Sequence, residues 1–96
     1  MYRLVLKPRA IEMAREAYNW YEKQRIGLGG LFLAELDNCY DRLEVHPDSY
    51  QKTENNFRQI IVRTFPYVIV FEILKDDVVI YAVFHTSRNP GKKFKR

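Results

Sequence analysis

Residues 78–84, Val-Val-Ile-Tyr-Ala-Val-Phe, constrain the fold more than any other segment of this chain. The run is apolar throughout and rich in β-branched and aromatic side chains, which favour strands. A strand with one face in water would alternate between apolar and polar residues, and this one does not. We therefore predict a central strand that has both of its faces covered.

Three other segments are predicted to be strands. Residues 57–64 and 67–74 are β-rich, and Phe65-Pro66 and Lys75-Asp76-Asp77 form the short connections between the three C-terminal runs. Connections of this length suit antiparallel hairpins. At the other end of the chain, residues 2–7 alternate well enough to form a short additional strand.

Two amphipathic helices are predicted between the first strand and the others. The first starts after Pro8 and runs from residue 9 to about 25, with an apolar face made of Ile11, Ala14, Tyr18 and Tyr21. Three glycines, Gly27, Gly29 and Gly30, turn the chain. The second helix runs to about residue 45, before Pro47, with Phe32, Leu36, Cys39, Tyr40 and Leu43 on one side. Residues 48–56 are polar and are predicted to form a loop.

This order of elements predicts one α+β domain over residues 1–96, large enough for a single core. We expect an antiparallel helical hairpin packed on a small twisted antiparallel sheet, in the order β-α-α-β-β-β. Residues 91–96 are expected to form a basic, mobile tail.

Charge is distributed unevenly along the chain. Residues 88–96 hold five basic side chains and no acid, whereas residues 10–48 hold four basic and eight acidic groups. The basic end should attract a polyanion or an acidic protein surface, while the helical half repels it. A solvated tail without a partner is the alternative interpretation.

Composition excludes several classes of protein. No segment reaches the roughly 20 apolar residues of a membrane span, and the charged N-terminus does not resemble a signal peptide. Cys39 is the only cysteine and falls on an apolar helix face, which predicts a buried packing role and a reducing cytoplasm. With only two histidines and no cysteine pair, neither a metal site nor a cofactor is predicted.

Two arginines in the first C-terminal strand are candidate phosphate-binding or target-binding residues. With the two-residue period of a strand, Arg58 lies on one face with Ile60, and Arg63 on the other with Ile61. Each arginine could instead form a structural contact at a strand end.

A second candidate cluster follows the apolar strand, in the sequence His-Thr-Ser-Arg-Asn-Pro at residues 85–90. His85 can exchange protons near neutral pH, and Arg88 can bind a phosphate or carboxylate through two hydrogen bonds. Together they would serve phosphodiester transesterification, which needs an acid or base and a stabiliser of charge on phosphorus. A structural role for His85 is equally compatible with the spacing.

The whole chain resembles the RelE/ParE superfamily of toxins from bacterial type II toxin–antitoxin systems. Three segments carry the resemblance: FLAELDNCYDRLEVHP at residues 32–47, FRQIIVRTFPYVIVFEI at 57–73, and VIYAVFHTSRNP at 79–90. The resemblance implies a helical hairpin on a small sheet, a cytoplasmic location and a cognate antitoxin that wraps the toxin.

RelE-like members cut mRNA in the ribosomal A site, whereas ParE-like members inhibit DNA gyrase. The positions at which RelE-like members carry two strand lysines correspond to Gln59 and Ile61, and a third, cationic position corresponds to Val68. Arg88 matches a late-strand arginine, and Phe94 replaces a tyrosine and lacks its hydroxyl. These differences favour a ParE-like toxin that binds gyrase.

Two alternatives remain at this point, and with them the question whether the chain is an enzyme. One is a ribosome-dependent mRNA interferase that uses His85 and Arg88. The other is a non-toxic member of the superfamily that only binds antitoxin. Contacts to the target or to phosphate are expected from Arg58, Arg63, Arg88, Lys92, Lys93, Lys95 and Arg96.

Overall fold

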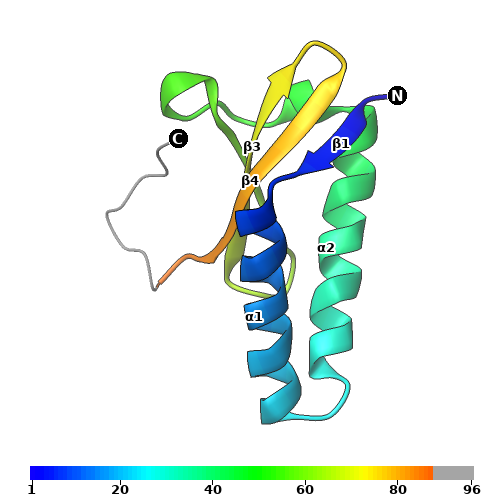
Figure 1. Ribbon diagram of the computed structural model, residues 1–96, viewed down its shortest axis with the longest axis vertical. Helices are drawn as coiled ribbons and strands as arrows, with labels where there is room; N and C mark the ends of the chain where they lie inside the picture. Colours follow the sequence, from blue (N-terminus) through cyan, green and yellow to red (C-terminus); the bar gives the residue numbers. More distant parts are fainter. Residues whose placement is uncertain (88–96) are drawn as a thin grey trace.

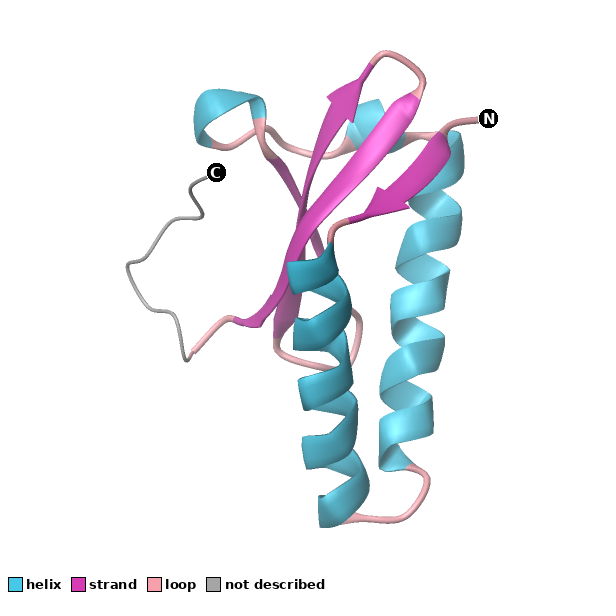
Figure 2. Ribbon diagram, viewed as in Figure 1, coloured by secondary structure: helices cyan, strands magenta, loops and turns pink. Residues whose placement is uncertain are grey.

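Two long helices lie against one face of a four-stranded sheet in the computed structural model, which describes residues 1–87 (Figure 1). The strands are β1 (Arg3–Leu6), β2 (Arg58–Ile61), β3 (Tyr67–Leu74) and β4 (Asp77–His85), and the helices are α1 (Pro8–Gln24) and α2 (Leu28–Val45). The predicted order of elements is confirmed. Figure 2 shows the two helices side by side, joined by a short turn at the end remote from the N-terminus.

The strand order in the sheet is β1-β4-β3-β2, so β4 is a central strand, as predicted. The prediction that both of its faces are covered is only half confirmed, because the two helices lie against one face of the sheet. The prediction of a wholly antiparallel sheet is wrong, because β1 pairs with β4 in parallel, from Arg3 opposite Asp77 to Leu6 opposite Ile80. The direction of β1 follows from its connection: its C-terminal end leads directly into α1, which packs along β4. The sheet is therefore mixed.

The helical hairpin is closed by a glycine and a carboxylate. Gly27 precedes α2 with a φ of 91°, in the left-handed region that glycine enters without steric cost. The side chain of Glu22 then accepts hydrogen bonds from the backbone N–H groups of Gly27 (2.9 Å) and Gly29 (3.0 Å). These bonds satisfy donors that the first turn of a helix leaves without an intrahelical partner.

Aromatic rings from both helices and from the sheet meet in the core. The Phe32 ring lies 5.4 Å from Tyr21, 5.3 Å from Phe65 and 5.0 Å from Tyr67, measured between ring centroids. The predicted apolar face of α2 is buried at Phe32, Leu36, Cys39 and Leu43. Burial also raises the pKa of the Cys39 thiol, as its predicted packing role requires.

The predicted face of α1 is only partly correct. The buried residues of this helix are Ala10, Ala17 and Tyr21, whereas Ile11 is 51% exposed. Ala10 and Ile11 both lie near the helical repeat that includes Tyr21. Because α1 packs against both α2 and β4, the face that contains Ala10 is the one that is buried. The face that packs is therefore rotated by about one position from the predicted one.

The segment between α2 and β3 differs from the prediction in two ways: its first part contains short 3₁₀ turns, and its strand is shorter than predicted. Two short 3₁₀ turns, Pro47–Ser49 and Glu54–Asn56, occupy most of the predicted loop. In contrast, β2 ends at Ile61, and the chain turns through Thr64, whose φ is 72°. The Val62 N–H donates to the Tyr67 carbonyl (2.9 Å), so this turn still closes the hairpin.

Candidate functional site at the end of β4

His85 is the last residue of β4, and its side chain lies on the helix-covered face of the sheet. It pairs with Tyr67, whose ring packs in the core, and residues directly opposite each other in a sheet share a face. The two rings meet edge to face, with centroids 5.2 Å apart. The Ser87 N–H donates to Nδ1 of His85 (3.1 Å), which leaves the proton of the neutral imidazole on Nε2.

A cleft of about 340 Å³ opens beside this histidine, between the end of β4 and α1. Its walls include Glu16 and Trp20 from α1 and Phe84 from β4. We call it the His85 cleft. It places an imidazole near a carboxylate and a half-exposed indole. Among residues 1–87, its lining contains no lysine or arginine that could hold a phosphate.

The strand cation Arg58 has a structural contact. Its guanidinium Nη1 donates to the backbone carbonyls of Tyr50 (2.6 Å) and Asp48 (3.2 Å), and so ties β2 to the turn that follows α2. Arg58 shares the helix-covered face with Phe71, its partner in β3. Arg63 lies beyond the end of β2 in the exposed turn. The structure therefore brings neither arginine to the His85 cleft.

Arg88 and the basic residues Lys92, Lys93, Lys95 and Arg96 lie outside the described residues. The polar turn predicted at 85–90 is described as far as Ser87. Over that part it is held in place, since the Thr86 N–H (2.8 Å) and hydroxyl (3.2 Å) both donate to the carbonyl of Pro66.

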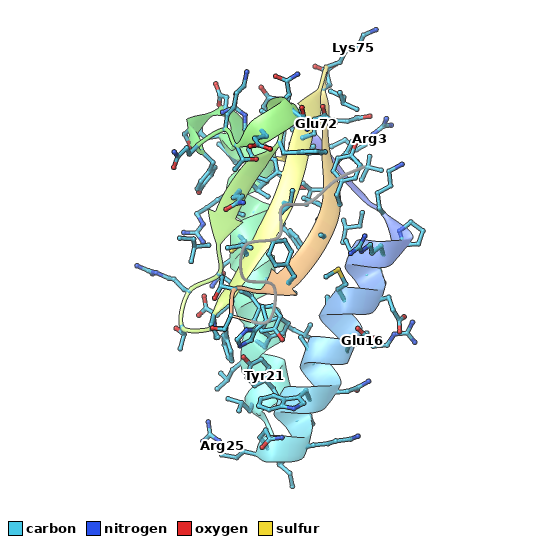
Figure 3. The ribbon with its side chains drawn as sticks, turned by 90° about the vertical axis from the view of Figure 1, so that its left-hand side faces the viewer. Arg3, Glu16, Tyr21, Arg25, Glu72 and Lys75 are labelled. Carbon is cyan, nitrogen blue, oxygen red and sulfur yellow. The ribbon has the colours of Figure 1, made fainter. Side chains whose placement is uncertain are left out.

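The face of the sheet turned away from the helices, which we call the outer face, contains a polar pair that the sequence reasoning missed. In β2, β3 and β4 this face is formed by Gln59, Ile61, Val68, Val70, Glu72, Leu74, Asp77, Val79, Tyr81, Ala82 and Phe84. On this face the Tyr81 hydroxyl donates to Glu72 (3.0 Å), whose side chain is buried. Figure 3 views the molecule with the sheet in front of α2 and labels Glu72. Glu72 is the only charge in the apolar run of β3, a signal that could have identified it.

The four described strands contain few positively charged side chains. Arg3 and Arg58 are the only lysine or arginine residues in β1 to β4. Arg3 pairs with Asp77 through two hydrogen bonds of 3.0 and 3.1 Å, and Arg58 is held by backbone carbonyls. The outer face therefore presents an amide, aliphatic and aromatic groups, and carboxylates.

The contacts of Arg58 predict that it contributes more to the stability of the fold than Arg63 does. We expect Arg58→Met to lower the free energy of unfolding by about 1.5–3 kcal/mol, because hydrogen bonds to a charged donor contribute on this scale. The matched control Arg63→Met should stay within about 0.5 kcal/mol of wild type, since it alters an exposed turn residue. Urea denaturation followed by circular dichroism measures both, and equal losses would contradict a structural role specific to Arg58.

Comparison with protein families identifies the chain. The family model described as "ParE toxin of type II toxin-antitoxin system, parDE" matches residues 4–90. The chain belongs to this family of toxins. No curated protein sequence gives a significant match.

Solved structures of toxin–antitoxin systems share the fold of this ParE-family chain. A chain of the chromosomal ParDE system from P. aeruginosa superposes with a TM-score of 0.79 at 12% identity, covering 90% of this chain and 97% of that one. A chain of the intact E. coli RelBE toxin–antitoxin complex gives a TM-score of 0.69 at 16% identity, covering 90% and 98%. The superpositions show the fold that the resemblance implied.

The described residues contain neither a metal-binding cluster nor a membrane-spanning helix. No set of three histidine, cysteine, aspartate or glutamate side chains within residues 1–87 is arranged to hold a metal ion. Over the same residues, no helix combines the length and the apolar character that crossing a membrane requires.

Proposed function

We propose that this ParE-family toxin acts in the cytoplasm by binding a protein target, DNA gyrase, rather than by cutting RNA, and that a cognate antitoxin neutralises it. The observation that carries the proposal is the chemistry of the outer face. Its described residues include one buried carboxylate, Glu72, and no lysine or arginine of β2, β3 or β4 lies on it; Arg3 of the neighbouring strand β1 is paired with Asp77.

Cleavage of a phosphodiester develops negative charge on phosphorus, and preorganised donors must stabilise it. The three positions that resemblance aligns with cations of RelE-like members are Gln59, Ile61 and Val68. The structure places all three on the outer face, with Ile61 directly opposite Val68. Each missing donor would cost about 2.7–4 kcal/mol of transition-state stabilisation, which is a large loss of rate.

The position of His85 also supports protein binding. The imidazole lies on the helix-covered side of the sheet, so the sheet separates it from the outer face. An acid–base pair for RNA cleavage needs the proton-transferring group and the phosphate-binding groups around one reacting atom. Within residues 1–87, the His85 ring packs against Tyr67, and the cleft beside it is lined by Glu16 and Trp20 rather than by a lysine or arginine.

The basic residues at 88–96 are proposed to strengthen the encounter with the target. Five positive charges on a short segment attract an acidic protein surface over about one Debye length, roughly 8–10 Å at physiological salt. We assign this role to Arg88, Lys92, Lys93, Lys95 and Arg96, together with the exposed Arg63.

Two parallel assays test the proposal. Purified toxin should inhibit DNA supercoiling by gyrase, and cells induced to make the toxin should show no new translation-dependent mRNA 5′ ends. His85→Gln should keep the inhibition of growth, because the imidazole transfers no proton in this mechanism.

The opposite pattern, with new 5′ ends, unaffected gyrase and a His85→Gln variant that is harmless, would instead assign mRNA cleavage to the chain. Wild-type protein that is inactive in both assays but still binds the antitoxin would leave only the non-toxic alternative.

A further inference from the structure

The outer face of the sheet is buried over much of its area, although both helices lie against the opposite face. Five of its residues are each 6% exposed or less: Val68, Val70, Glu72, Val79 and Ala82. A sheet face that meets only water would leave such side chains largely exposed. The outer face therefore has a cover that neither helix supplies.

Phe57 supplies part of this cover. Its ring contacts the ring of Tyr81, with centroids 5.4 Å apart, and it packs with Val70 and Ala82 in a small apolar cluster, which we call the outer cluster. Phe57 is itself only 2% exposed, whereas residues 51–56 before it are polar and exposed. A further apolar group is therefore needed over the outer cluster.

A charge on the outer face also needs compensation. Glu72 is 4% exposed and accepts a hydrogen bond from the Tyr81 hydroxyl (3.0 Å). Burial of a carboxylate is costly unless cations or several donors offset its charge. The two cations of the strands are engaged elsewhere, Arg3 by Asp77 and Arg58 by backbone carbonyls. A cover with its own cations would meet this need.

The chain beyond Ser87 has the length and the starting point for such a cover. It continues from the end of β4 through nine residues, 88–96. Nine extended residues span about 30 Å, and the nine residues of β4 rise by a similar length. The sequence Asn89-Pro90-Gly91 favours a turn, and a reversal there directs the last residues back along the strand.

The composition of residues 88–96 matches both needs of the outer face. Phe94 is a large apolar side chain that suits the outer cluster, and Lys93 and Lys95 flank it. The segment holds five basic residues and no acid. Attraction between one of these cations and Glu72 is strengthened on an apolar face, because such surroundings weaken charges less than water does.

We propose that residues 88–96 of this chain fold back over the outer face, with Phe94 on the outer cluster and a flanking lysine paired with Glu72. The segment then covers the second face of β4, as the apolar sequence of that strand requires. A lysine paired with Glu72 is neutralised, so the contact adds no phosphate site. The free toxin keeps this face closed, and a partner that binds there has to displace the segment. The inference goes beyond the proposed function, because it holds whichever protein the toxin inhibits.

Trypsin, which cuts after lysine and arginine, tests this contact in the full-length toxin. Residues 88–96 contain several such sites, and a docked segment is cut only while it is released. We expect cleavage within the segment to be at least tenfold slower than in a free peptide of residues 86–96, with both rates followed by mass spectrometry. Equal rates would overturn the proposal.

Two substitutions at one position identify the apolar contact. Phe94→Ser should remove at least most of the tenfold protection, because a hydroxymethyl group cannot cover the outer cluster. Phe94→Leu should keep it, since leucine still buries an apolar side chain. Each rate is divided by that of a free peptide with the same substitution, which corrects for the preference of the protease. Equal protection in the two variants would contradict docking through Phe94.

The charged contact is tested by two changes of the same kind. Glu72→Gln removes the charge and can still accept the Tyr81 hydrogen bond, so it should fold, as circular dichroism would verify. It should speed cleavage of the segment severalfold, whereas Glu16→Gln, an exposed change on α1, should match wild type. Equal rates in these two variants would overturn the pairing with Glu72. These assays need neither gyrase nor antitoxin, so their failure would leave the proposed function untouched.

Discussion

Phe32→Ala is expected to lower the free energy of unfolding by about 3–5 kcal/mol, the usual cost of removing a fully buried aromatic ring. Phe32 has no exposed surface and contacts the rings of Tyr21, Phe65 and Tyr67. At Phe32, α2 contacts a ring of α1 and a ring of the sheet at once. Since a domain of this size has a total stability of about 5–15 kcal/mol, the variant should be close to unfolding at 37 °C.

Urea denaturation followed by circular dichroism measures this loss. Leu33→Ala is the matched control, because Leu33 is the next residue of α2 and is 39% exposed. Leu33→Ala should lower the free energy of unfolding by about 1 kcal/mol or less, because the Leu33 side chain is already partly in water and its removal gives up less buried apolar surface. A Phe32→Ala variant that matched this control would show that the aromatic cluster does not hold the hairpin to the sheet.

Gly29→Ala should also destabilise the fold, with a loss of about 1–3 kcal/mol in the free energy of unfolding. A Cβ atom on Gly29 would lie 2.7 and 2.8 Å from two carbons of the Tyr18 ring and 2.8 Å from the Tyr18 carbonyl oxygen. The ring can rotate away, but the carbonyl belongs to α1. The two helices must therefore separate where α2 begins.

Gly30→Ala is the control for this prediction, with the same chemical change one residue later. Nothing lies within 4 Å of the added Cβ, so only helix propensity acts, and the variant should gain about 0.5–1 kcal/mol. The two substitutions should thus change the thermal midpoint in opposite directions. A shift in the same direction for both would contradict the close approach of the helices at Gly29.

Local patterns were sufficient to predict most of the fold. The apolar run of β4 identifies a strand with neighbours on both sides, and the glycines at 27–30 identify the hairpin turn, because both signals depend on residues close in the sequence. The direction of β1 depends on where α1 packs after it, and nothing within residues 2–7 encodes that. The exposure of Ile11 has a similar origin, since the neighbours of α1 select between two equally periodic faces.

The candidate site was less predictable than the fold. The period of two correctly separates the faces of β2, yet it cannot show that Arg58 reaches carbonyls eight and ten residues earlier in the chain. Glu35 had a readable signal, because it lies three residues after Phe32 and four before Cys39, on the core side of α2. That its Oε1 atom is buried without a hydrogen-bond partner among residues 1–87 is revealed only by the three-dimensional structure.

The parallel pairing of β1 with β4 also determines how the chain can assemble. Arg3 and Asp77 are 74 residues apart in sequence, so joining them closes a very long loop and carries a large entropic cost. The helical hairpin and the β2-β3-β4 meander need only contacts that are close in sequence. β1 should therefore dock late in folding and detach early in unfolding. A molecule that has lost β1 presents the unpaired edge of its most apolar strand, and such an edge can capture the equivalent segment of another copy.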